Sequence, residues 1–138
     1  MFEYLEHTAD IKIRVKAKNE FEFFSDIVKS VNEAIFEAKP IKCDKHRELV
    51  LESGSIEQLI HDFIDEIVYI ANYEHFASKL FSCNLEYKKE KYILTCSFVL
   101  CETKKEDYKI EVKAVSFNVL YKEDVKTKEK SCEFVLDI

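Results

Sequence analysis

Apolar and polar side chains alternate in residues 11–17, so this stretch has the period of a β-strand with one buried face. Further along, apolar side chains recur at helical spacing over about residues 20–38 and again over residues 56–71. The pattern therefore predicts a strand followed by two amphipathic helices. Leu49–Glu52 reads as a short strand between the two helices.

Both predicted helices carry start signals. Asn19 and Ser55 stand at the N-cap positions, and Glu22 and Gln58 follow at the spacing of a capping box. Pro40 should end the first helix, because proline cannot continue the backbone hydrogen-bond ladder.

Beyond about residue 80 the pattern is that of β-structure. Residues 81–87 and 92–100 alternate on either side of a charged turn and predict an antiparallel pair. Residues 110–121 predict one further strand, and its apolar phase changes at Lys113-Ala114, which indicates a β-bulge. The last strand should point Cys132, Phe134, Leu136 and Ile138 inward.

This order of elements favours an α+β fold. We expect a single domain over residues 1–138, with two helices packed on a mainly antiparallel or mixed β-sheet. A hydrophobic content of 47% indicates that the whole length folds.

The polar face of the first strand is wholly basic and consists of Lys12, Arg14, Lys16 and Lys18. This face could bind phosphate or an acidic partner, or it could serve solubility and discourage edge-to-edge pairing of strands; we favour the second interpretation. A net charge of −6 argues against indiscriminate binding of nucleic acid, since that affinity comes from excess Lys and Arg. Any role with RNA should be indirect or confined to one face.

The five cysteines form no C-x-x-C pair, and the first residues are acidic where a signal peptide is basic. We therefore expect a cytoplasmic protein with reduced thiols. Cys83, Cys96 and Cys132 fall on apolar phases of predicted strands and should act as small buried apolar residues. A membrane location is not expected, because no apolar run approaches the roughly 20 residues of a membrane helix.

With a single glycine, the chain has neither a glycine-rich phosphate loop nor a G-x-S-x-G nucleophile turn. The residues therefore favour a binding protein over an enzyme. Asp62, Asp65 and Glu66 lie close enough on the second helix to share a cation, although a solvated acidic face is the commoner arrangement.

Carboxylates near both ends of the sequence form a second candidate site. His7 and Asp10 precede the first strand, Asp137 lies in the last strand, and Ile138 supplies main-chain oxygens and a terminal carboxylate. Oxygen ligands of this kind suit calcium, magnesium or manganese. The alternative is that Asp10 caps a turn and Asp137 is an ordinary polar residue at a strand end.

Three stretches, Glu6–Asp10 (EHTAD), Glu111–Phe117 (EVKAVSF) and Val135–Ile138 (VLDI), resemble the archease family in order and spacing. The resemblance implies an accessory protein of the RtcB-type RNA ligase of tRNA splicing. Such a protein is not itself an enzyme, and it promotes formation of the ligase–guanylate intermediate and multiple turnover.

The resemblance also assigns residues. It implies a divalent metal, calcium in the family, held by Asp10, Asp137 and Ile138, and functional roles for Lys113 and Glu102. The chain departs from the family pattern at Asn72, Cys101 and Ser116-Phe117-Asn118. A small metal-dependent hydrolase and a general protein-binding chaperone are the alternative functions, and the sequence leaves the oligomeric state open.

Overall fold

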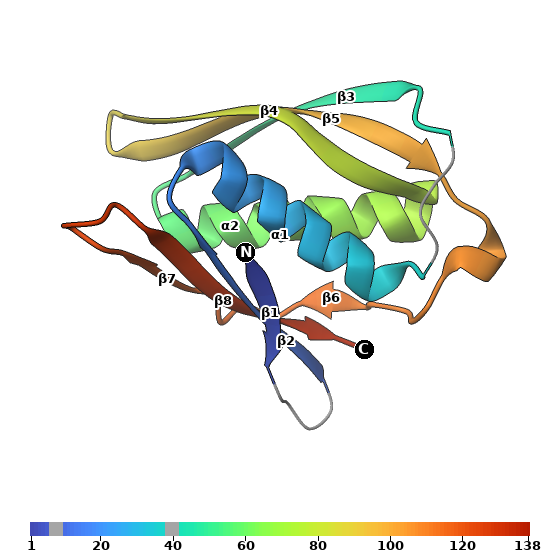
Figure 1. Cartoon of the computed structure of the whole chain (residues 1–138). Coiled ribbons are helices and arrows are strands. Elements are labelled where there is room, and N and C mark those ends of the chain that lie inside the picture. Colours follow the sequence, from blue (N-terminus) through green and yellow to red (C-terminus); the bar gives the residue numbers. More distant parts are fainter. Residues whose placement is uncertain (6–9, 38–41) are drawn as a thin grey trace.

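The computed structural model describes residues 1–5, 10–37 and 42–138, and it has three layers (Figure 1). Two helices lie side by side between a five-stranded and a three-stranded β-sheet. Every strand pairing within these ranges is antiparallel. The α+β class and the two helices are thus as predicted, but the strands form two sheets instead of one.

The five-stranded sheet has the order β1-β2-β8-β6, and β7 also pairs with β8. Its strands are β1 (Phe2–Leu5), β2 (Asp10–Ala17), β6 (Ala114–Val115), β7 (Leu120–Glu123) and β8 (Lys130–Asp137). Because β2 lies between β1 and β8, its basic face does not protect a sheet edge. Lys12 and Arg14 instead pair with Glu133 on β8, and Arg14 also pairs with Glu3 on β1.

The three-stranded sheet has the order β3-β5-β4. It consists of β3 (Lys45–Ser53), β4 (Phe76–Lys88) and β5 (Lys91–Glu102), and β3 is longer than the predicted Leu49–Glu52. Lys89 and Glu90 connect β4 to β5 with φ values of 51° and 64°. Two consecutive positive φ angles suit a tight hairpin, and here residues other than glycine adopt them.

The helices begin where the sequence predicts. In α1 (Glu20–Ile35), Asn19 Oδ1 accepts a hydrogen bond from the Glu22 N–H at 2.7 Å. In α2 (Ile56–Tyr69), Ser55 Oγ accepts from the Gln58 N–H at 3.2 Å. The helix α1 ends earlier than predicted, at Ile35, and Pro40 lies outside the described residues.

The core fills the space between each sheet and the helices. Phe24 of α1, Phe63 of α2 and Phe98 of β5 are almost completely buried, and their rings follow one another with centroid distances of 5.2 and 5.8 Å. Phe23 is also buried, whereas Phe21 is 44% exposed. None of the helices in the described part of the chain is long and apolar enough to cross a membrane.

The prediction of one strand over residues 110–121 is wrong. Only β6 and β7 are strands in this region, and Leu120 lies five residues after Val115 whereas their partners on β8, Glu133 and Leu136, are three residues apart. The Ser116 N–H still bonds to Val135 O at 2.8 Å, but the Val119 N–H then bonds to Phe117 O at 3.1 Å in a tight turn, and pairing with β8 resumes only at Leu120. The apolar phase change at Lys113-Ala114 therefore coincides with the start of β6, and a separate interruption at residues 116–119 divides β6 from β7. Ile138 is also not inward-facing, because it is 46% exposed.

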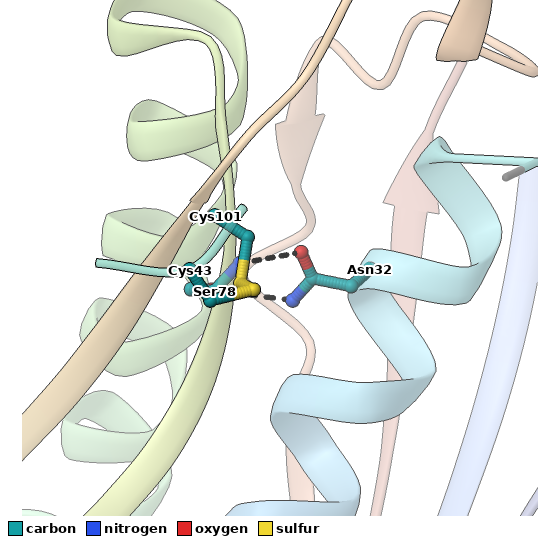
Figure 2. The surroundings of a disulfide bond; sticks show 4 residues. All are labelled: Asn32, Cys43, Ser78 and Cys101. Carbon is teal, nitrogen blue, oxygen red and sulfur yellow. Dashed lines mark hydrogen bonds between the residues drawn. A yellow bond between two sulfur atoms is a disulfide. The ribbon is translucent and has the colours of Figure 1, made fainter. Parts of the chain in front are cut away.

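The prediction that all cysteines are reduced is wrong too, since Cys43 and Cys101 form a disulfide (Figure 2). Cys43 lies two residues before β3 and Cys101 lies near the end of its partner strand β5, and the Glu102 N–H bonds to Lys42 O at 2.9 Å next to them. Among the free thiols, Cys96 and Cys132 are buried as expected, whereas Cys83 is only half-buried. Burial raises the pKa of Cys83 to about 11 and that of Cys96 and Cys132 to about 12.

Candidate functional site

Asp10 and Asp137 are direct partners in the β2–β8 ladder. Residues opposite one another in an antiparallel pair have Cβ atoms about 5 Å apart and point to the same face of the sheet. The expectation that these two distant acids meet in the fold is therefore confirmed. Ile138 follows Asp137 and lines a pocket of about 470 Å³ with Asp10.

The same pocket contains an acid that sequence reasoning missed. Glu33, on the exposed side of α1, lines it together with Asp10 and Ile138. The Glu33 carboxylate and burial both raise the pKa of Tyr4, which also lines the pocket, and burial is the larger cause. No local motif around Glu33 marks this position, because only the packing of α1 against the sheet brings it there.

The kind of donor in this region fits a hard divalent cation, since all the side-chain ligands would be carboxylate oxygens. Two carboxylates directly opposite each other repel, and a cation between them would offset that cost. The number of such carboxylate ligands in this region is small. Across residues 1–5, 10–37 and 42–138, no group of three or more His, Cys, Asp or Glu side chains is arranged to hold a metal. His7 lies outside the described residues.

The backbone of Lys113 lies next to Asp137. Its N–H donates to Asp137 O at 2.7 Å, and the following residue, Ala114, pairs with Asp137 in the β6–β8 ladder. The Lys113 side chain is exposed and lines a second pocket. The structure thus brings the Lys113 backbone next to Asp137, whereas its side chain lies in a pocket that neither Asp10 nor Asp137 lines.

Glu102 belongs to the other sheet. It is exposed at the end of β5, where it pairs with Phe76 and directly follows the disulfide-bonded Cys101. The next residue, Thr103, donates its hydroxyl to His75 O at 2.6 Å. Figure 2 shows that β4, next to the disulfide, is hydrogen-bonded to α1. The Asn32 amide accepts a bond from the Ser78 N–H at 3.0 Å and donates to Ser78 Oγ at 3.2 Å.

Two histidines have structural surroundings that their sequence context does not reveal. His61 is buried, and its ring stacks on Phe117 with a centroid distance of 4.8 Å. His75 Nδ1 lies 3.1 Å from the Tyr108 hydroxyl. Both contacts join segments far apart in the sequence, so local patterns carried no signal for them.

A model of the Archease protein family (MTH1598/TM1083) matches residues 2–138. The chain belongs to the archease family. Protein archease of Methanosarcina barkeri is 30% identical over 122 residues, which cover 86% of this chain and 84% of that protein. Protein archease of Pyrococcus furiosus is 28% identical over 119 residues, which cover 85% and 84%.

Solved archease structures have the same fold. The solution structure of Methanobacterium thermoautotrophicum protein 1598 matches with a TM-score of 0.81 at 23% identity, over 99% of this chain and 98% of that chain. The crystal structure of a Thermotoga maritima archease, described as a possible chaperone, matches with a TM-score of 0.62 at 17% identity, over 97% and 94%. The archease fold expected from the three motifs is thereby confirmed.

Proposed function

We propose that this archease-family protein is a non-enzymatic activator of an RtcB-type RNA ligase in tRNA splicing. In this role it promotes guanylylation of the ligase and so supports multiple turnover. The observation that carries the proposal is the convergence of the three archease-like stretches. Asp10 of the first stretch and Ala114 of the second are both ladder partners of Asp137 in the third.

This convergence supports the transfer of family roles to individual residues. Motifs that match by chance would have no reason to occupy adjacent positions on the neighbouring strands β2, β8 and β6. Asp10, Asp137 and a main-chain oxygen of Ile138 would hold a divalent cation, calcium in the first instance, with magnesium or manganese as alternatives. The ion supplies positive charge that joins the ends of β2 and β8.

Lys113 and Glu102 are the residues we assign to contact with the ligase. Both side chains are exposed. A lysine ammonium is a compact charge that can pair with a phosphate or a carboxylate of a partner. RNA takes part only through the ligase, in keeping with the net charge of −6.

The alternatives differ in what they require. A general chaperone would bind unfolded proteins without regard to the ligase, and Phe117, which is 82% exposed, is the kind of side chain that such binding uses. A small metal-dependent hydrolase would turn over a substrate alone. An activator does neither.

The test is ligation of cleaved RNA by the cognate ligase, with and without this protein. We expect stimulation when the RNA substrate exceeds the ligase, and faster formation of the ligase–guanylate intermediate. A ligase that is already guanylylated should complete a single turnover at the same rate in both cases. Equal stimulation of the single and multiple turnovers would show that guanylylation is not the assisted step.

A further inference from the structure

The second pocket has a volume of about 460 Å³ and lies beside the candidate metal site without sharing its carboxylates. Two segments build it: the π-helical turn η1 (Ile70–Glu74) that extends α2, and the stretch that leads into β6. Its lining residues are Asn72, Tyr73, His75, Tyr108, Glu111 and Lys113. A pocket of this size can hold a small molecule.

The backbone at this pocket is unusual. A π-helical turn is rare and is frequently found at functional sites. It ends at His75, which has φ 62° and ψ 39°, a left-handed conformation that costs free energy in residues other than glycine. Backbone of this kind persists only where its surroundings hold it.

Three hydrogen bonds hold it here. Tyr108 Oη donates to Ala71 O at 2.6 Å, Asn72 Nδ2 donates to Val112 O at 2.7 Å, and the Thr103 hydroxyl donates to His75 O. The first two bonds join the two pocket segments directly. The pocket walls are therefore already ordered in the absence of a ligand, which lowers the free-energy cost of ordering them on binding.

These bonds also decide which polar atoms remain for a ligand. The Tyr108 hydroxyl proton is committed to Ala71 O, so the contact with His75 is made by a proton on His75 Nδ1. His75 Nε2 is then an acceptor when the ring is neutral. Asn72 uses its amide N–H, and within the described part of the chain its Oδ1 accepts no hydrogen bond.

Glu111 and Lys113 complete the set of polar groups. Both are exposed on either side of the buried Val112, and neither has an ion-pair partner among the described residues. Tyr73, which is 73% exposed and rests against Tyr69 at a centroid distance of 5.1 Å, adds an aromatic surface. The pocket thus offers one cation, a carboxylate with further acceptors, and aromatic rings.

We propose that this pocket binds a nucleotide, with the base against the aromatic rings, the phosphate on Lys113 and the edge of the base on Glu111. Aromatic side chains stack on bases of any sequence, and a lysine pairs with phosphate. Guanine is the preferred base, because its two adjacent N–H groups match the two oxygens of one carboxylate. This binding belongs to the isolated protein and does not depend on ligase activation.

The test is calorimetric titration of the full chain with GMP, AMP, CMP, guanosine and inorganic phosphate. We expect saturable binding of GMP, with an affinity at least about tenfold higher than for guanosine or phosphate alone, as loss of a charge-assisted contact implies. Lys113→Ala should reduce GMP binding to the level of guanosine. Glu111→Gln should remove the preference for GMP over AMP.

Lys122→Ala and Glu123→Gln are the matched controls, because both residues are exposed on β7 and do not line the pocket. They should leave all affinities unchanged. Absence of saturable nucleotide binding would overturn the proposal, as would GMP binding that neither pocket variant alters. Phosphate binding as tight as GMP binding would show a plain anion site instead. Because the titration contains no ligase, a negative result would overturn nucleotide binding without deciding the proposed activator function, which the ligation assay tests.

Discussion

The Arg47 guanidinium holds the Glu74 carboxylate through two hydrogen bonds of 2.6 and 2.7 Å. This ion pair joins β3 to the π-helical turn η1, and Glu66 of α2 is near enough for its charge to interact with that of Arg47. The contact lowers the pKa of Glu74, with the hydrogen bonds from Arg47 as the largest cause. Glu66 has the opposite shift, because burial raises its pKa more than the Arg47 charge lowers it.

These opposite shifts predict opposite effects of removing each charge. Because the pKa of Glu74 is lower in the folded protein, its carboxylate stabilises the fold above its ordinary pKa of 4.5, and this contribution is lost as the pH falls. At pH 7, Glu74→Gln should cost about 1 kcal/mol of unfolding free energy, within the range of exposed ion pairs. Denaturant unfolding at pH 7 and pH 3 measures this, and the cost should be smaller at pH 3 than at pH 7.

Glu66→Gln is the matched control. Its charged form is disfavoured by burial, so neutralising it at pH 7 should leave stability unchanged or raise it slightly. If both variants lose the same stability at pH 7, the ion pair is not the source of the effect.

The Cys43–Cys101 disulfide predicts a strong dependence of stability on reductant. The two cysteines are 58 residues apart in the sequence, and a crosslink that closes a loop of this length stabilises a fold by about 4 kcal/mol in the chain-entropy account. Reduction with dithiothreitol should lower the melting temperature, and Cys101→Ala should do so without reductant. Cys83→Ser removes a half-buried thiol outside the crosslink and should leave the response to reductant intact.

Lys113→Ala should lower stimulation of the ligase with little change in melting temperature. Its side chain is exposed, and the bond that ties this residue to Asp137 comes from the backbone N–H, which alanine retains. Glu102→Gln should behave in the same way. Multiple-turnover ligation and thermal melts of the variants, with Lys122→Ala as a control on β7, measure both quantities. A large fall in melting temperature in Lys113→Ala would make Lys113 a structural residue.

Local signals predicted the helices well, because Asn19 and Ser55 cap them by hydrogen bonds within a single turn. The proximity of Asp10 and Asp137 was also accessible, since two strands of strict alternation and a family motif at each end constrained the pairing. The division into two sheets was not accessible, because alternation within a strand does not say which neighbour it pairs with.

The remaining misses are contacts between distant segments. The disulfide depends on the β3–β5 register, and the π-helical turn depends on Tyr108 and Val112, which are far from α2 in the sequence. Glu33 reaches the pocket of Asp10 only through the packing of α1. None of these has a periodicity or composition that a sequence pattern could display.

The proposed metal site yields the last prediction, which concerns the main-chain oxygens of Ile138. Two side-chain carboxylates leave most positions of a hard cation unfilled, so an oxygen from Ile138, next to Asp137, is needed to complete the cluster with solvent. Calcium should raise the melting temperature of a chain that ends at Ile138. It should raise it much less in Asp10→Ala, in Asp137→Ala and in a chain extended beyond Ile138 by a short flexible tag.

The same tag placed at the N-terminus is the control for the extension, and Asp124→Asn, in the connection between β7 and β8, is the control for loss of an acid. Calorimetry with calcium should give weaker binding for the extended chain and for both aspartate variants, while circular dichroism shows an unchanged fold. Ligase stimulation should fall in parallel, because the proposed ion would join the strand ends that carry the archease motifs. If the extended chain binds calcium and stimulates the ligase as well as the N-terminally tagged one, the terminal carboxylate of Ile138 is not a ligand. The site would then have to be completed by other oxygens, of which the Glu33 carboxylate in the same pocket is the first to test.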